Sequence, residues 1–174
     1  ITDWLKINYG LHLSSFFVDD QAYHSLQPRI SGNTILTKKS SLKFSYAYST
    51  QFIHLLSNTG IGLPTDLWVP STAEVGPINS HQVSLGYNQI LGEKYNLVLE
   101  GYYKTMDGVI QYKEGIDFIG TGNNWESKIE RGKGWSYGGE LFVEKKVGKL
   151  TGWVGYTLSW TDRQFENING GEKF

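Results

Sequence analysis

The stretch that decides the fold is STQFIHLLSNTGIGLPTDLWVPSTAEVGPINSHQVSLGYNQIL, residues 49–91. Its two ends alternate apolar and polar side chains, as strands do. About two dozen residues rich in Gly, Pro, Ser and Asn connect them. Within this polar connection lies an apolar segment, GIGLPTDLWVPS, residues 60–71. A loop that is long and still keeps a tryptophan and two prolines is expected to pack onto another surface or to carry a function.

The composition of the whole chain favours strands and turns over helices. Of the 174 residues, 14% are aromatic and 21 are glycine, whereas hydrophobic residues make up only 39%. The 16 basic and 17 acidic residues are interspersed and leave a net charge of −1, which argues against a nucleic-acid partner. Cysteine is absent, which fits an oxidising compartment but does not require one.

Period-two alternation predicts seven strands and no helix. In the last of these runs, Val154, Tyr156 and Leu158 share one face, and Thr157 and Ser159 share the other. A run with a proline, SLQPRISG, is the least regular of the seven. The predicted strands lie in residues 3–17, 25–32, 41–56, 81–91, 96–115, 137–147 and 149–160.

Alternation alone does not distinguish a membrane barrel from a soluble sandwich. The lengths of the strands and of their connections do. The runs at 42–56 and 97–112 exceed the five or six residues usual in soluble sheets. Tight turns are expected at 92–95 and 147–150, in contrast to long connections at 57–80 and 113–134. Up-and-down order places the tight turns at one end of the sheet, which is the asymmetry of outer-membrane barrels.

Aromatic residues near the predicted strand ends fit the same interpretation. Trp4 and Tyr95 lie on the turn side, and Phe52, Tyr112 and Trp160 lie on the loop side. Girdles of tryptophan and tyrosine mark the two interfaces of a bilayer, although strands are also rich in aromatics generally. Because bacterial single-chain barrels have even strand numbers, seven strands predict an arc of a larger barrel.

Several ordered motifs resemble a known family. They are LPTDLWVPS, then YYK followed by YKEG, then GKLTGW leading to YTLSW and RQF. Together they are similar to the C-terminal barrel half of TonB-dependent outer-membrane receptors of the type common in Bacteroidota. The likeness spans at least residues 42–174, and the opening strands fit it. The plug domain, the TonB-binding box and the terminal strand of that family are not found in this sequence.

The resemblance implies an all-β, antiparallel, up-and-down transmembrane β-barrel segment, about seven strands of a barrel expected to have 22. Residues 1–174 would then be a fragment of the barrel domain, located in the outer membrane of a Gram-negative cell. The function implied is active import of a scarce nutrient: a glycan, a peptide or a metal chelate. Implied partners are outer-membrane lipid, the protein's own plug and remaining strands, the TonB complex and a surface substrate-binding lipoprotein.

Two loops contain candidate ligand-binding residues. In the first, Asp66 and Trp68 could face a ligand, with the indole stacking on a flat group. In the second, GTGNNWESKIERGKGW at 120–135, a stacking ring lies beside hydrogen-bonding groups suited to glycans or peptides. Our sequence interpretation favours an architectural cap for the first loop and a solvated loop for the second. The candidates from the second loop are Asn123, Asn124, Trp125 and Glu126.

Charged residues on the predicted polar face are expected to line the lumen or contact the plug rather than perform chemistry. They are Glu100, Lys104, Glu140, Glu144 and Lys146. The four histidines are dispersed, so no zinc site is predicted, and no phosphate loop, dinucleotide fingerprint or nucleophile elbow occurs. We therefore expect no enzyme activity and no cofactor.

Two other function classes remain open from the sequence. One is an extracellular β-sandwich binding module, whose apolar side would be covered by a second sheet. The other is a non-transporting outer-membrane barrel, either an adhesin or an enzyme. Which solvent meets the apolar side of the sheet distinguishes the first of these from a barrel.

Overall fold

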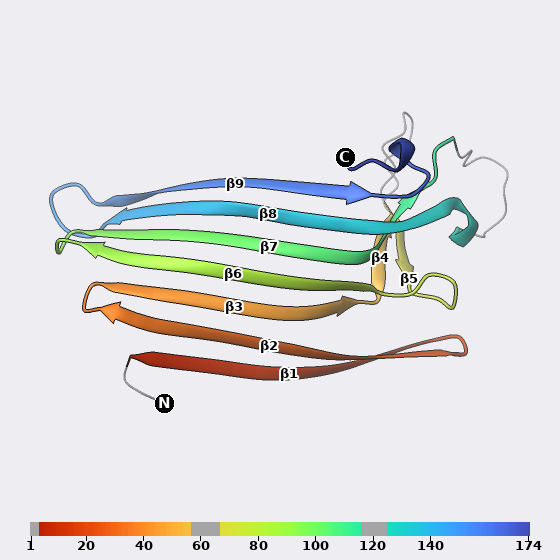
Figure 1. The fold of residues 1–174 in the computed structure, drawn as a ribbon, viewed down its shortest axis with the longest axis horizontal. Helices are drawn as coiled ribbons and strands as arrows, with labels where there is room; N and C mark the ends of the chain where they lie inside the picture. Colours follow the sequence, from red (N-terminus) through yellow and green to blue (C-terminus); the bar gives the residue numbers. More distant parts are fainter. Residues whose placement is uncertain (1–3, 57–66, 116–124) are drawn as a thin grey trace.

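A computed structural model describes residues 4–56, 67–115 and 125–174. The chain forms one large antiparallel sheet with a small two-stranded hairpin at one end (Figure 1). Two short 3₁₀ turns, η1 (Glu126–Lys128) and η2 (Asn169–Gly171), complete the described structure. The strands are β1 (Leu5–Val18), β2 (Gln21–Thr37), β3 (Ser40–Gln51), β4 (Ile53–Leu56), β5 (Leu67–Pro70), β6 (Ile78–Leu91), β7 (Tyr95–Tyr112), β8 (Ile129–Lys145) and β9 (Gly152–Gln164).

The seven-stranded sheet has the order β1-β2-β3-β6-β7-β8-β9, and each strand pairs with its sequence neighbours in the sheet. The predicted all-β antiparallel fold is therefore confirmed. One predicted strand was drawn too long: the run at 42–56 breaks at Phe52. There the chain leaves the sheet, and Ile53–Leu56 pairs instead with Leu67–Pro70, part of the segment expected to be loop.

Connections at the two ends of the sheet differ in length, as predicted. One end, here called the turn end, carries the short connections at 38–39, 92–94 and 146–151. The opposite end, here called the loop end, carries the long connections 52–77 and 113–128 (Figure 1, right). The connection between β2 and β3 consists only of residues 38–39, because both strands extend up to it.

The exception at the loop end is the two-residue turn between β1 and β2. Asp19 there adopts φ 47, in the left-handed region that aspartate tolerates in tight turns. At the turn end, Gly92 adopts φ 62 in the β6–β7 connection. Both turns keep consecutive long strands in antiparallel register from end to end.

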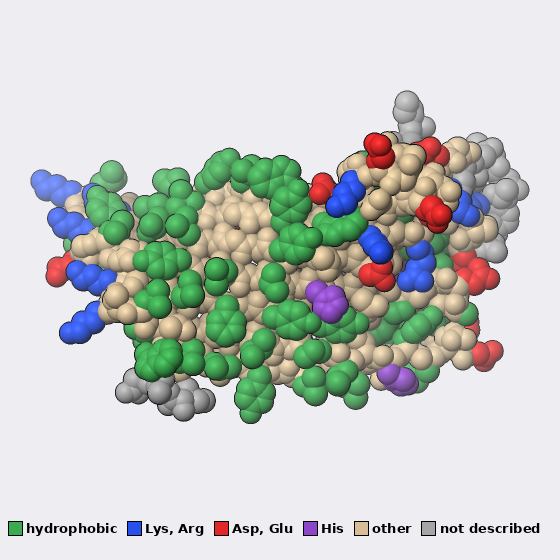
Figure 2. Space-filling view, in the orientation of Figure 1, with side chains coloured by type: hydrophobic (Ala, Val, Ile, Leu, Met, Phe, Trp, Pro, Cys, Tyr) green, Lys and Arg blue, Asp and Glu red, His purple; other side chains and the backbone are tan. Residues whose placement is uncertain are grey.

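Strand register separates an apolar face from a polar face across the whole sheet. Leu85 pairs with Gly101, Leu141 with Tyr156, and Gly139 with Leu158, so the apolar side chains of adjacent strands fall on one side. These side chains are largely exposed: Tyr9 is 89% accessible, Leu13 67% and Tyr156 61%. Figure 2 shows hydrophobic side chains spread over this face from one edge of the sheet to the other.

Buried apolar side chains lie mainly at the loop end. One cluster joins the hairpin to β7 and β8, and a second joins β7 to the segment after β9. No segment in the described ranges covers the apolar face of the large sheet, and its large side chains are therefore exposed. The first cluster consists of Leu56, Val69, Val75, Ile110 and Ile129, and the second of Val109, Phe165 and Ile168.

The two edges of the sheet do not meet, and no closed barrel forms within the described residues. β1 pairs only with β2. On the outer side of β9, Arg163 and Phe174 exchange two backbone hydrogen bonds, 2.8 and 3.0 Å between nitrogen and oxygen. The same described ranges contain no helix with the length and hydrophobicity needed to cross a bilayer.

Candidate functional site

The β4–β5 hairpin forms because the break at Phe52 turns the chain away from β6. The backbone nitrogen of Ser71 donates to the carbonyl of Phe52 at 2.7 Å, which closes the hairpin at its base. Along β4, His54 and Leu56 are buried while Ile53 and Leu55 are half-exposed. The buried side of the hairpin packs against β7 and β8 through the first cluster, so the hairpin is held firmly over the loop end of the sheet.

His54 is fully buried in this hairpin. Its Nε2 lies 3.0 Å from the Ser71 hydroxyl, whereas its Nδ1 has no hydrogen-bond partner among the described residues. Burial, and secondarily the positive charge of Arg131, lower the pKa of His54 from its ordinary value of 6.5. The imidazole is therefore neutral near pH 7 and leaves one polar ring atom unused.

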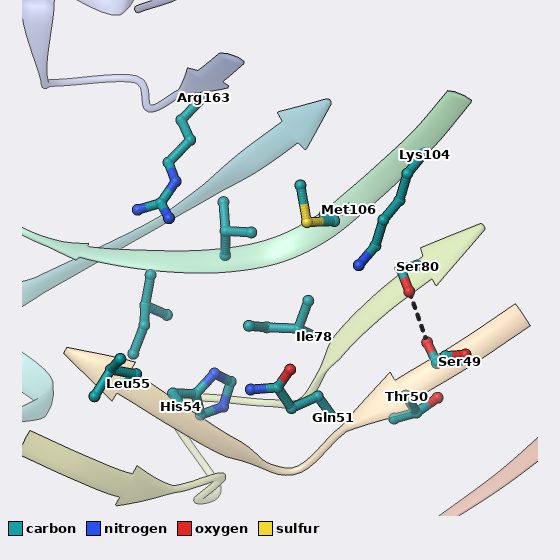
Figure 3. A pocket seen from close by; sticks show the side chains of 12 residues that line it. Ser49, Thr50, Gln51, His54, Leu55, Ile78, Ser80, Lys104, Met106 and Arg163 are labelled. Atoms are coloured by element: carbon teal, nitrogen blue, oxygen red, sulfur yellow. Dashed lines mark hydrogen bonds between the residues drawn. The ribbon is translucent and has the colours of Figure 1, made fainter. Parts of the chain in front are cut away.

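A cavity of about 390 Å³ opens beside His54, between the hairpin and the polar face of the sheet (Figure 3). β3, β4, β6, β7 and β9 all contribute to its wall, and the cavity thus sits where the hairpin meets the sheet. Its polar lining consists of Ser49, Thr50, Gln51, His54, Ser80, Lys104 and Arg163, and its apolar lining of Leu55, Ile78, Met106, Val109 and Ile110.

A β-bulge in β7 shapes one wall of this cavity. The register shifts between Asp107 and Val109, where Gly108 adopts φ 82. After the bulge, the adjacent Val109 and Ile110 are both buried, each in a different apolar cluster. This segment of β7 therefore joins the cavity wall to both clusters.

Two cationic side chains enter the cavity without acidic neighbours in its wall. Met106 of β7 pairs with Gly134 of β8, which pairs with Arg163 of β9. Because residue 134 has no side chain, nothing on β8 separates Met106 from Arg163 on the polar face. Figure 3 shows Arg163 and Lys104 on the two sides of Met106, both reaching into the cavity. No Asp or Glu of the described residues lines it.

The predicted loop residues have different environments. Trp68 lies on β5 with 63% of its surface exposed. Trp125 is half-buried and packs against the first apolar cluster, and Glu126 accepts a hydrogen bond from the Thr72 hydroxyl. The second loop is thereby joined to the first. Three of the predicted ligand-binding residues, Asp66, Asn123 and Asn124, lie outside the described residues.

Four of the five predicted lumen residues lie on the polar face of the sheet, and Lys146 lies just beyond the end of β8. Glu100 and Glu140 are directly opposite each other on β7 and β8. Glu144 lies farther along β8 and pairs with Lys146, at 3.4 Å between nitrogen and oxygen. Lys104 is the one member of this set that lines the cavity.

Sequence reasoning did not select His54 or Arg163. His54 was one of four dispersed histidines. Arg163 follows the last predicted strand and opens the RQF motif, which was used only for the family resemblance and not as a site. Among the described residues, no three His, Cys, Asp or Glu side chains could jointly hold a metal ion. What the cavity offers is recognition chemistry: two positive charges, hydroxyl and amide groups, one unpaired imidazole nitrogen and an apolar wall.

Comparisons with known proteins bear on the fold. No protein-family model matches the sequence, and no curated protein matches it. Among solved structures, the chain is similar to the FrpB iron transporter from Neisseria meningitidis (F3-3 variant), with a TM-score of 0.59 and 13% sequence identity. The match covers 86% of this chain and 21% of that chain, so this chain spans about a fifth of the transporter's length. The described sheet therefore has the fold of one segment of that transporter.

Proposed function

We propose that this chain forms part of the wall of a TonB-dependent transporter in the outer membrane of a Gram-negative cell, where it imports a scarce nutrient. The single observation that carries the proposal is the exposed apolar face, which runs across all seven strands opposite a polar face. Each large apolar side chain moved out of water gains roughly 1.5–3 kcal/mol. A sheet with this many exposed apolar side chains is stable in hydrocarbon and unfavourable in water.

The charged and aromatic residues at the turn end support the same environment. Lys38, Lys39, Lys94 and Lys149 are exposed in the short turns, beyond the apolar face. Figure 2 shows Lys and Arg side chains gathered at the left, at the end of the hydrophobic surface. The Nζ of Lys145 lies 5.9 Å from the ring centre of Tyr95. Lysine and tyrosine together suit the headgroup region of a bilayer.

In this proposal the polar face lines the lumen of a barrel that closes with further strands of the same protein. The backbone groups on the outer edge of β1 need such strands, because hydrocarbon provides no hydrogen-bond partner. The plug domain would contact Glu100 and Glu140 on the polar face, and the TonB complex would act through that plug. A surface lipoprotein would meet the loop end. Glycan, peptide and metal chelate all remain candidates for the nutrient, and the proposal assigns no enzyme activity.

Membrane fractionation of cells that produce the complete protein tests this proposal. We expect the protein in the outer-membrane fraction of a density gradient, extractable only with detergent. We also expect a folded band on a cold electrophoresis gel that shifts on boiling, as closed barrels give. A detergent-free monomer in the soluble fraction would refute the proposal and favour the β-sandwich binding module.

Transport itself needs a second readout. Uptake of the nutrient should stop when the gene for this protein, or the gene for TonB, is deleted. Correct outer-membrane location with uptake unchanged when the gene for this protein is deleted would favour the non-transporting barrel instead.

A further inference from the structure

We infer that the cavity beneath the β4–β5 hairpin binds a small organic anion, recognised through an oxyanion group such as a carboxylate or a phosphate. The inference deepens the proposed function and rests on it for its biological meaning, since a cavity on the lumen side would be met by the transported solute. The binding chemistry itself rests on the residues that line the cavity.

The charge of the cavity comes from Lys104 and Arg163. Neither side chain has an ion pair or a hydrogen bond with another described residue, and within residues 4–56, 67–115 and 125–174 no carboxylate lines the cavity. Asp107 and Asp162 are close to the two cations along their strands. Their positions in the strands, however, place them on the apolar face, opposite to the cavity. Two cations that share a partly enclosed space without a counter-ion repel each other, and an anion between them removes that repulsion.

Neutral donors around the two cations can complete the recognition of an oxyanion. Figure 3 shows Gln51, Ser49 and Ser80 on the side of the cavity that faces Lys104. The Ser80 hydroxyl lies 3.5 Å from the Ser49 carbonyl, a long contact that leaves this hydroxyl available to a closer acceptor. Hydroxyl groups and cationic side chains together form short, charge-assisted hydrogen bonds to carboxylate and phosphate oxygens.

His54 is the second, independent observation that points to a ligand. It lines the cavity, it is 0% exposed, and its Nδ1 has no partner among the described residues. A buried polar atom without a hydrogen bond is unfavourable and uncommon in folded proteins. When Nε2 accepts the Ser71 hydroxyl proton, Nδ1 carries the ring hydrogen and is a buried donor without an acceptor among the described residues.

The size and apolar wall of the cavity limit the ligand class. A volume of about 390 Å³ equals on the order of a dozen water molecules. Leu55, Ile78 and Met106 line the cavity between its polar groups, so part of the ligand is a hydrocarbon skeleton. A compact organic acid fits this description, and citrate is a suitable probe of the class.

Citrate binding by the complete protein in non-ionic detergent tests the inference. Calorimetric titration should show saturable binding of citrate but not of trimethyl citrate, the uncharged ester of the same skeleton. In the K104Q/R163Q variant the affinity should fall about a hundredfold, because each charged hydrogen-bond donor contributes about tenfold or more. The matched control is K43Q, since Lys43 is exposed on the same polar face but does not line the cavity.

A second measurement uses the unaltered protein, in case the double variant does not fold. An amine-reactive ester should label Lys104 several-fold more slowly with saturating citrate, whereas the labelling of Lys43 stays the same. No saturable binding of citrate or inorganic phosphate, equal affinity in K104Q/R163Q and the unaltered protein, or unprotected Lys104 would each overturn the inference. These outcomes are distinct from failure of the proposed function, which cell fractionation decides without reference to any ligand.

Discussion

Replacing Leu158 by arginine tests which solvent meets the apolar face. Leu158 occupies the middle of β9, and its side chain is 45% exposed on that face. If hydrocarbon surrounds it, an arginine near the bilayer midplane costs about 2–4 kcal/mol of folding free energy. If water surrounds it, the substitution removes only the burial of about half of the leucine side chain, which costs about 1 kcal/mol of folding free energy.

Two control substitutions on the same strand allow the effect of Leu158→Arg on stability to be compared with that of arginine at other positions of β9. Thr157 is the next residue, exposed on the polar face opposite Glu140, so Thr157→Arg should change stability by about 0.5 kcal/mol or less. Val154 is 71% exposed on the apolar face but near the turn end. Because the cost of a charge falls toward the interface, Val154→Arg should cost about 0–1 kcal/mol in a bilayer.

The assay is reversible unfolding of the complete protein in phospholipid vesicles, followed by tryptophan fluorescence against denaturant concentration. We expect Leu158→Arg to be the most destabilising of the three by at least about 1 kcal/mol. Equal effects of Leu158→Arg and Val154→Arg, both near 1 kcal/mol or below, would show no dependence on depth. That result would refute the conclusion that the apolar face meets hydrocarbon.

Three further predictions concern the loop end and the packing of β8. Because the pKa of His54 is lowered on folding, the unfolded state takes up a proton first as pH falls below 6.5, so acid should destabilise the hairpin. Amide exchange at 53–56, corrected for its intrinsic pH dependence, should be faster at pH 5 than at pH 7.5, and His54→Asn should abolish the difference. Gly132→Ala would drive a methyl group into the Gln164 carbonyl and the Phe165 ring and should cost about 1–3 kcal/mol, measured by thermal unfolding. Gly139→Ala, whose methyl group would lie 3.7 Å from its nearest neighbour, is the control, and equal effects would contradict this packing. Glu126→Gln weakens the hydrogen bond from Thr72 and should raise proteolytic cleavage in 113–128 without changing the melting temperature of the sheet, whereas unchanged cleavage would show that this contact does not hold the loop.

The alternation of side chains was sufficient to predict the two faces of the sheet. Leu158 and Trp160 against Thr157 and Ser159 is a local pattern, and the register confirms that each member lies on the expected side. The short connections at 92–94 and 146–151 were predictable as well, since glycine and charged residues interrupt the alternation there.

The break at Phe52 was not predictable from this pattern. Apolar residues continue through Ile53, Leu55 and Leu56 without a turn signal, so the sequence looks like one long strand. The partner of that segment, Leu67–Pro70, ends in a proline and lies in a segment rich in turn residues. The pairing of the two depends on packing against β7 and β8, which no local signal carries.

The cavity was equally hidden from the sequence. Lys104 and Arg163 are far apart along the chain, and the register of three strands with a glycine between them brings them to one space. His54 is a single histidine on an apolar segment, which is more commonly a core residue than part of a site. Its unpaired nitrogen becomes visible only when its neighbours are known.

In the large sheet each strand pairs with the strands that precede and follow it along the chain, and this order affects which changes the protein can tolerate during evolution. β3 and β6 remain paired although the chain 52–77 lies between them. Doubling the length of such a connection adds only about 0.6 kcal/mol of loop-closure entropy. Insertions and exchanges at the loop end can therefore accumulate while the strand register stays intact, so descendants can diverge in what they recognise and keep one inherited wall.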